Sequence, residues 1–368
     1  MSSRRVTAAA VLTGLPDITH ARLRALLRRW PDPVDALDAV VRSATAGCFD
    51  PPVPAATRRD WRTFAADTRG TAAIGATVSA RGTRALRAVD PTFPIDPELI
   101  PDHPAILLAE GKRYDALDAP RVAIVGTRAA TPHGLDDARS LAADLVAEGV
   151  TVVSGLAIGI DAAAHQGALD AGGLTVGVVA TGLDVEYPRR HRSLYAQVRA
   201  SGLVLSESGF GIRPEPRRFP IRNRIIAALA DVTVVVEATA RGGARITAEH
   251  AMRYGRDVFA VPGSRRNPAA EGCNELIRDG AHPLLRNDDV LLRLGCTPGS
   301  RRRPTPAPVR LPVDGDAARV LAAFAGEPAT PDQLAHRCAL GVGAVALALC
   351  TLARDGWARS EGGHWWPT

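Results

Sequence analysis

The stretch RRFPIRNRII at residues 217–226 brings together the side chain types that bind a nucleic-acid strand. Its four arginines carry guanidinium groups, which hold phosphate oxygens through paired hydrogen bonds. Phe219, between them, offers an aromatic face on which a base can stack. The stretch therefore predicts contact with both a phosphate backbone and a base.

Pro220 and the apolar run behind it predict a helix over residues 222–230. Arg222, Asn223 and Arg224 would then lie near the helix N-terminus. Unpaired N–H groups and the positive end of the helix dipole favour an anion at that position. We interpret the stretch as a phosphate-binding site.

A purely structural role for these arginines is the alternative. Arg222 and Arg224 would then pair with a nearby acidic residue, Glu207, Glu215 or Asp231, and hold a loop in place. We favour the phosphate site because arginines this dense beside an aromatic residue suit a nucleic-acid backbone better.

The elements that must position this stretch are alternating strands and helices between about residues 120 and 292. Strands are predicted at 121–125, 150–154, 175–180, 203–206, 232–237 and 258–261. Helices are predicted at 134–148, 159–171, 191–200, 222–230, 245–254 and 269–279. Repeated βα units of this length indicate an α/β fold with a parallel sheet and helices on both faces, and ligands of such folds collect at the carboxyl ends of the strands.

Glycine-rich turns follow these strands and place further candidates at the same edge of the sheet. Gly126 and Arg128 follow the first strand, and Ser154 and Gly155 end the second. Glycine lets the backbone approach a phosphate closely and frees N–H groups to donate to it. The Gly-x-Gly-x-x-Gly pattern of dinucleotide enzymes does not follow the first strand, and the phosphate loop of nucleoside triphosphatases is missing. We expect no cofactor.

Asp161 and His165 lie four residues apart on one predicted helix face, a spacing that suits an acid–base or metal pair. No third ligand or nucleophile accompanies them at a recognisable spacing. We favour a hydrogen-bond network that shapes the glycine-rich turn, and we predict no metal site and no catalytic residue.

Residues at the two ends of the chain predict further domains beside a core at 71–296, of which 71–105 is a lead-in without an assigned role. Residues 1–70 resemble a helix-hairpin-helix or similar small bundle, which serves DNA or protein contacts equally well. Residues 297–312 form a basic, proline-rich linker. Its arginines could touch DNA, but we favour a linker that only tethers the two neighbouring domains. Residues 313–368, with three helices and a hairpin, indicate a winged helix. Its third helix is almost entirely Ala, Val and Leu, which favours a protein-contact or structural module over a duplex reader.

Composition indicates a globular protein. Its positive charge favours a polyanionic partner, and a GC-rich genome is the alternative source of the arginine and alanine bias. The formal net charge is +6 and the sequence pI about 9.5, and Lys112 is the only lysine. Five cysteines are scattered without a Cys-x-x-Cys pair, which fits a reducing compartment. The apolar run after Arg4-Arg5 is too short for a signal peptide or a membrane span. We therefore expect a cytoplasmic protein without membrane contact.

Several blocks occur together in a fixed order. They read VAIVGTR at 122–128, VSGLAIGID at 153–161 with Ala164-His165, GLDVEYP at 182–188, FPIRNRIIA at 219–227 and GRDVFAVPG at 255–263. Together they resemble the DNA-processing protein A (DprA/Smf) family. Any one block alone is weak, but their order over some 170 residues is specific.

This resemblance implies an extended Rossmann-like core that binds single-stranded DNA without chemistry and loads the RecA recombinase onto it during natural transformation. It also implies a homodimer. By motif position the DNA contacts would be Arg128, Phe219, Arg222, Asn223 and Arg224. Gly126, Ser154 and Gly155 would supply turns or backbone donors.

The chain departs from the family pattern at three places. Thr127 stands where serine is usual and keeps the hydroxyl group. Arg245 adds a charge to the fifth turn, which could alter the edge of the pocket. The lysines that commonly supplement the DNA path are missing, so other arginines would have to serve: Arg189, Arg190, Arg192, Arg213, Arg217 and Arg218.

A competing hypothesis is an enzyme, a nucleotide phosphoribohydrolase of the lysine-decarboxylase-like family, which uses a similar Rossmann core. Its Pro-Gly-Gly-x-Gly-Thr motif with a following glutamate is only partly echoed by RGGARITAE at 241–249. Arg245 takes the place where that motif keeps a glycine. A duplex-reading regulator that acts through the winged helix is a third possibility.

Overall fold

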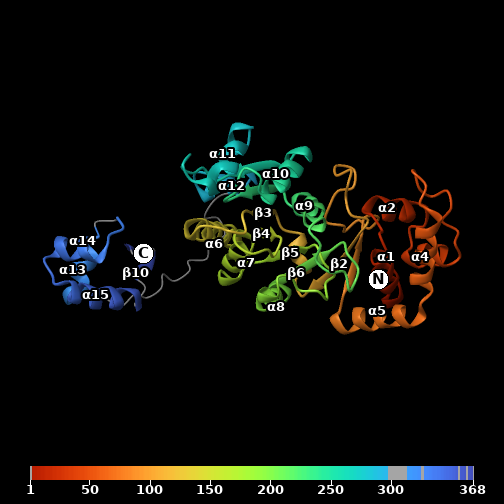
Figure 1. Ribbon diagram of the computed structural model, residues 1–368, viewed down its shortest axis with the longest axis horizontal. Helices are drawn as coiled ribbons and strands as arrows, with labels where there is room; N and C mark the ends of the chain where they lie inside the picture. The colour runs from red at the N-terminus through yellow and green to blue at the C-terminus, as the bar shows by residue number, and fades with distance from the viewer. Residues whose placement is uncertain (1, 297–312, 325–326, 355–356, 362–363, 368) are drawn as a thin grey trace. The chain divides into compact units, whose positions relative to one another are not determined.

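The computed structural model describes residues 2–296, 313–324, 327–354, 357–361 and 364–367 (Figure 1). The predicted linker at 297–312 lies outside the described residues. Contacts divide the chain into two compact units, Met1–Arg301 and Arg302–Thr368.

Five helices open the first unit. They are α1 (Ser3–Thr13), α2 (His20–Arg29), α3 (Pro33–Val41), α4 (Ala55–Ala66) and α5 (Thr68–Arg81). Local chemistry explains their starts: the Thr19 side chain accepts from the Arg22 N–H at α2, and Asp32 accepts from the Val34 N–H at α3. Trp61, fully buried, donates from Nε1 to the Pro16 carbonyl at 2.7 Å. This bond holds the turn after α1 against α4.

A nine-stranded sheet forms the centre of the unit. The strands are β1 (Arg84–Arg87), β2 (Ile106–Gly111), β3 (Arg121–Val125), β4 (Thr151–Ser154), β5 (Thr175–Val179), β6 (Gly202–Ser206), β7 (Val232–Val235), β8 (Asp257–Ala260) and β9 (His282–Pro283). Their order is β1-β2-β6-β5-β4-β3-β7-β8-β9. The strands from β6 to β9 in this order are parallel, whereas β2 pairs antiparallel with β6 and β1 antiparallel with β2.

The six predicted strands and the α/β fold class are confirmed. The prediction missed β1, β2 and β9. Most of β2 is an apolar run that ends at Glu110, and nothing in its local pattern announces a strand that pairs antiparallel with the distant β6. β9 is only two residues long.

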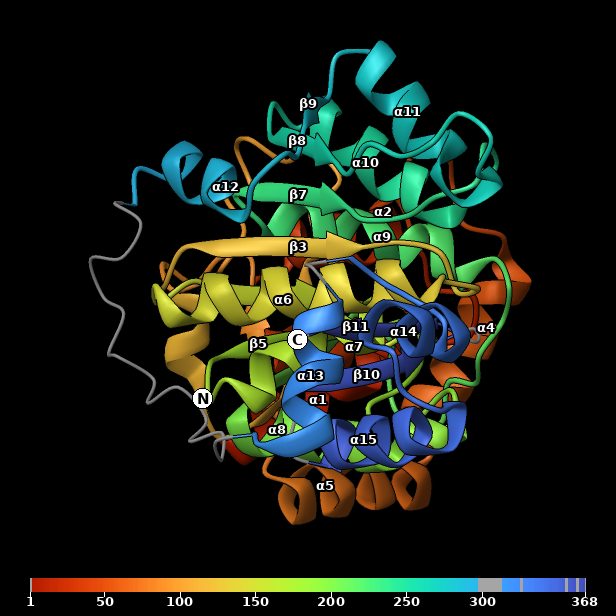
Figure 2. The same ribbon diagram turned by 90° about the vertical axis from the view of Figure 1, so that its left-hand side faces the viewer.

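Further helices follow the strands and cover both faces of the sheet. They are α6 (Pro132–Ala147), α7 (Ile160–Asp170), α8 (Arg192–Ser201), α9 (Arg218–Leu229), α10 (Gly243–Arg253), α11 (Glu271–Arg278) and α12 (Asn287–Arg293), with 3-10 turns at Tyr114–Leu117, Arg189–His191 and Pro268–Ala270. Side chains of β3 alternate between two clusters: Val122 and Ile124 join α6 and α7, whereas Ala123 and Val125 join α9 and α10. Figure 2 shows β3 and β7 side by side with α6 across the near face.

Helix α9 begins at Arg218, four residues before the predicted start. Pro220 occupies the third helical position, in the first turn, where its missing N–H costs no intrahelical bond. Arg222, Asn223 and Arg224 therefore lie in the second turn rather than at the first unpaired N–H groups.

The N-terminal helices share an apolar cluster with the sheet. Leu12 and Leu26 pack in the same cluster as Ile106 of β2 and Val198 of α8. The sequence predicted a boundary between a helical domain and the core at residue 70. α5 runs across that residue, and the boundary stays a prediction.

A buried ion cluster reinforces this join. Glu110 of β2, 3% exposed at its side chain, accepts from Arg81 of α5 at 2.7 Å and from Arg199 of α8 at 3.1 Å. Both arginines also donate to the Leu183 carbonyl at 2.9 Å. Because a buried carboxylate must be paired, these bonds hold β2 in place at the antiparallel edge.

The second unit has α13 (Gly315–Ala323), α14 (Pro331–Cys338) and α15 (Val342–Arg354), followed by the hairpin β10 (Ala358–Glu361) and β11 (His364–Pro367). Thr330 caps α14 as predicted, and its own N–H donates to the Gln333 side chain at 2.9 Å. The core includes Phe324, Leu334 and Leu349. Three helices and a hairpin match the predicted winged helix.

Candidate functional site

A cavity of about 650 Å³, the switch-point cavity, opens beyond the carboxyl ends of β3, β4 and β7. The chain runs from β3 through β4 and β5 in one direction along the sheet, then returns to place β7 on the other side of β3. Ligands of open parallel sheets bind where the strand order reverses in this way. The segments that line it include residues 125–128, residues 242–244 with 246 and 247, and the first part of α9.

Phe219, Tyr187 and Arg128 form an aromatic and cationic group at this cavity. The rings of Tyr187 and Phe219 lie 5.7 Å apart between centroids, tilted by 48°. The Arg128 guanidinium carbon lies 5.0 Å from the Phe219 centroid. Tyr187 is 42% exposed and Arg128 is exposed, so ring faces and guanidinium are open to a ligand.

The N-terminus of α10 supplies backbone donors to the same cavity. Gly242 precedes the helix without a side-chain cap, and Gly243 and Ala244 line the cavity. Unpaired N–H groups of a first turn attract phosphate. Asn223 connects α9 to this turn because its Nδ2 donates to the Gly243 carbonyl at 3.1 Å.

Arg222 reaches the cavity but is largely engaged within the protein. It is 6% exposed, and its Nη1 donates to the Gly155 carbonyl at 2.8 Å and to the Val178 carbonyl. Its Nε donates to the Asn223 side chain at 3.2 Å. Arg222 therefore fixes the ends of β4 and β5 and orients Asn223, and it adds positive charge behind the cavity wall.

Arg224 points to the other side of α9. Its side chain is 3% exposed and forms an ion pair with Glu207, which follows β6. It does not line the switch-point cavity. The structural alternative weighed for these arginines therefore describes Arg224, and Glu215 likewise pairs with Arg217 and Arg218.

Ser154 and Gly155 also lie behind the cavity wall. The Ser154 hydroxyl, fully buried, donates to the Ile124 carbonyl at 2.6 Å and ties β4 to β3. The Gly155 N–H donates to Asp161 at 3.1 Å. A Cβ at Gly155 would lie 2.6 Å from that carboxylate and 2.7 Å from Arg222, which explains the glycine.

Of the eight predicted site residues, the structure gathers five around one cavity: Gly126, Arg128, Phe219, Arg222 and Asn223. Ser154, Gly155 and Arg224 are not among its lining residues. The prediction missed Pro214 and Pro216, which line the cavity from the loop before α9. Their closeness in sequence to Phe219 and Pro220 is the signal that could have found them.

Asp161 and His165 act separately. Asp161 accepts from the N–H groups of Gly155 and Ala157, which confirms the hydrogen-bond network at the glycine-rich turn. Burial raises the pKa of Asp161, and the charge of Arg222 opposes that rise. His165 bonds Thr175 at 2.6 Å, and burial lowers its pKa to about 3.

Arginines that do not line the switch-point cavity differ in whether they pair with an acidic residue. Arg245 turns away from the cavity. It pairs with Glu275 and donates to the Ala240 carbonyl at 3.0 Å, so the extra charge of the fifth turn does not reach the cavity. Arg189 and Arg190 are exposed just after Tyr187, and Arg213 is exposed in the loop before α9. None of these three is among the residues that line the cavity.

Comparison with known proteins decides the family. Residues 84–295, more than half of the chain, match the family described as DNA recombination-mediator protein A, and residues 303–364 match the DprA winged helix domain. The chain belongs to the DNA recombination-mediator protein A family. It is 37% identical over 307 residues to Protein Smf of Synechocystis, covering 74% of this chain and 77% of that protein.

Two solved structures of the family are similar. The X-ray structure of DNA processing protein A from Streptococcus pneumoniae has a TM-score of 0.64 at 35% identity and covers 79% of this chain and 98% of that one. DNA processing protein A from Helicobacter pylori, solved to explain its unique single-stranded DNA binding mode, has a TM-score of 0.51 at 30% identity and covers 58% and 95%. The family resemblance in the sequence is confirmed.

The described residues were also considered for a metal site and for a membrane span. They contain no group of three or more His, Cys, Asp or Glu side chains placed to hold a metal ion. Over the same residues no single helix is long and apolar enough to cross a membrane, and one bent pair, α14 with α15, passes that test by length and composition only.

Proposed function

We propose that this family member binds single-stranded DNA in the switch-point cavity. The observation that carries the proposal is the open group of Phe219, Tyr187 and Arg128 beside the uncapped start of α10. Bases stack on the two rings, while Arg128 and the α10 N–H groups hold phosphates. The structural relative from Helicobacter pylori, described by its single-stranded DNA binding mode, supports this assignment.

The binding involves no chemistry on the DNA. Among the lining residues, all within the described chain, Asp161 is the one carboxylate, and it already accepts two backbone N–H groups. A catalytic base must instead be able to reach a substrate proton. Stacking and phosphate contacts alone give little sequence preference, which suits a protein that handles any strand.

A second copy of the chain completes the assembly in this proposal. β9 ends the sheet; Leu285, just after it, is 73% exposed, and Leu292 on the following helix α12 is 63% exposed. An open sheet edge flanked by exposed leucines is a surface that a second copy can cover. Light scattering of Leu285→Arg and Leu292→Arg should show monomers where the wild type is a dimer, and dimeric variants would move the interface elsewhere.

The bound strand is handed to a RecA-type recombinase in the cytoplasm. The family description as a recombination mediator supports this step. The test measures ATP hydrolysis by RecA on DNA covered with single-strand binding protein. Wild-type protein should shorten the lag, and Phe219→Ala should not. Equal lags with and without wild-type protein would rule out the proposed recombinase loading. They would not affect the proposed binding of a single strand.

The experiment for the site itself compares a fluorescent single strand with the same sequence as duplex, by anisotropy over a salt series. We expect a strong preference for the single strand, which Phe219→Ala weakens and the exposed control Arg213→Ala weakens less. Equal binding to duplex, or unchanged binding by Phe219→Ala, would overturn the proposal. Release of free base from a nucleoside monophosphate would replace it with the hydrolase hypothesis.

A further inference from the structure

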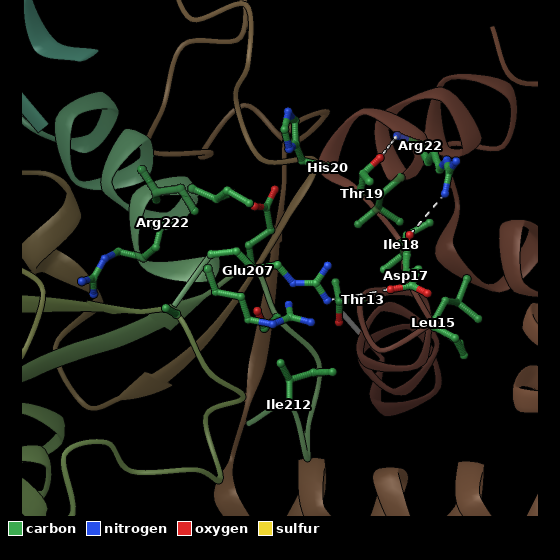
Figure 3. A pocket seen from close by; sticks show the side chains of 18 of the residues that line it. Thr13, Leu15, Asp17, Ile18, Thr19, His20, Arg22, Glu207, Ile212 and Arg222 are labelled. Atoms are coloured by element: carbon green, nitrogen blue, oxygen red, sulfur yellow. Dashed lines mark hydrogen bonds and ion pairs between the residues drawn. The ribbon is translucent and has the colours of Figure 1, made fainter. Parts of the chain in front are cut away.

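A second cavity, the seam cavity, lies where the N-terminal helices meet the sheet (Figure 3). It encloses about 410 Å³, within the range of pockets that hold small ligands. On one side lies the turn from Leu15 to His20, and on the other lie Glu207, Ile212 and the start of α9.

The seam cavity and the switch-point cavity flank the same part of α9. Arg222 lines both. Pro220 lines only the switch-point cavity, whereas the next residue, Ile221, lines only the seam cavity. A strand that leaves the stacked rings and crosses the start of α9 therefore arrives at the mouth of the seam cavity.

Side chains that line the seam cavity include isoleucines and, at the start of α9, two arginines, the entrance arginines. Ile18 and Ile212 are half-buried, and Ile221 is 47% exposed although it lines the cavity. Arg217 and Arg218 line it from the α9 end, with side chains 68% and 29% exposed. Isoleucines that face a cavity rather than a packed core suit the flat faces of a base.

The existing ion pairs of the entrance arginines do not block a ligand. Arg217 pairs with Glu215 at 2.7 Å and with Asp17 at 4.0 Å, and all three side chains are at least 40% exposed. Such exposed pairs contribute little and exchange readily for a phosphate. Glu207 also lines the cavity, but its carboxylate pairs with Arg224 and adds no uncompensated negative charge there.

We propose that the seam cavity takes one unstacked nucleotide of the bound strand, with its base between Ile18 and Ile221 and its phosphate on Arg217 and Arg218. The proposal rests on single-strand binding in the switch-point cavity. It makes the N-terminal helices part of the DNA site, because Leu15 and Ile18 form one wall.

The experiment fills the seam cavity without touching the first site. Ile221→Trp places a large ring in the cavity, and Arg217→Ala removes an entrance charge, while Arg213→Ala is the matched control in the same loop. Each full-length variant is titrated with a length series of oligonucleotides, starting at the shortest that binds. Thermal unfolding checks that the half-exposed position 221 tolerates tryptophan.

Wild-type affinity should rise stepwise at the length that reaches the seam cavity. Ile221→Trp should abolish that step, a loss of about fivefold or more for the longer strands, and leave the shortest unchanged. Arg217→Ala should reduce the step more than Arg213→Ala does. A step that persists in Ile221→Trp overturns the seam site alone, whereas no binding by the wild type at any length overturns the proposed function as well.

A fluorescent base identifies the occupant. 2-Aminopurine at single positions along the strand should brighten at the one position that leaves the stack for the seam cavity, and Ile221→Trp should remove that signal. Free deoxynucleoside monophosphates serve as the other arm. If they bind the wild type and Ile221→Trp blocks only them, the cavity takes a free nucleotide and the strand proposal is wrong.

Discussion

The two sides of α9 use the same residue type for opposite purposes. Arg128, packed on Phe219 at the switch-point side, is exposed and has its guanidinium beside an open ring. Arg224, on the other side, is 3% exposed at its side chain and pairs with Glu207. Exposure separates an arginine that can bind a ligand from one that stabilises the fold.

The physical reason is the cost of removing a charge from water. A buried guanidinium must find acceptors inside the protein, and its N–H donors are then no longer available for a ligand. Arg222 shows the intermediate case, since it borders the cavity yet donates to the carbonyls of Gly155 and Val178. Substitutions on the two sides of α9 should therefore produce different kinds of loss.

The largest effect should come from Arg224→Ala. It leaves Glu207, whose side chain is 16% exposed, without its partner, and we expect a loss of about 3 kcal/mol in the free energy of unfolding. Urea unfolding measures this. The matched variant Arg128→Ala should unfold like the wild type. An Arg224→Ala protein of wild-type stability that fails to bind DNA would make Arg224 a ligand contact and end the comparison.

Phe219→Ala should have the next largest effect, now on binding rather than folding. Loss of one stacking ring costs about 1–3 kcal/mol of affinity for a single strand. Phe219→Trp keeps a ring and should retain most of that affinity. Anisotropy titrations of both variants provide the measurement, and equal losses for alanine and tryptophan would show that the ring face does not contact a base.

The buried His165 should make the stability of the protein depend on pH. Its pKa is about 3 in the folded protein against 6.5 for an ordinary histidine, so the unfolded chain takes up its proton first as the pH falls. The contribution of neutral His165 to the free energy of unfolding is therefore full above pH 6.5. Below that pH it is lost, by about 1.4 kcal/mol per pH unit. His165→Asn should show a shallower decline between pH 6 and 4. Parallel pH curves would contradict this account.

Arg128→Ala should give the smallest change, seen best in the salt dependence. Each phosphate contact to a single strand contributes about 0.7 to the slope of log affinity against log salt. Losing one contact should lower the slope by about that amount, while Arg213→Ala should change it less. An unchanged slope would assign the phosphate contact to the α10 N–H groups alone.

Much of the site was predictable from the sequence because it rests on local patterns. The parallel strands, the glycine-rich turns and Phe219 with Arg128 all follow from runs of a few residues. The bonds from Asp161 to its own turn follow from a separation of six residues or fewer. Only the structure showed that Ser154 faces the neighbouring strand instead of the cavity.

The sequence by itself determined the α/β core, the winged-helix pattern and the family, since hydrophobic periodicity and ordered motifs are local properties of the chain. Tertiary structure alone decided which arginines are available. The packing of α9 on the sheet placed Arg224 against Glu207, and packing the N-terminal helices on the sheet created the seam cavity. Such outcomes depend on contacts between residues distant in sequence, whose burial no local pattern records.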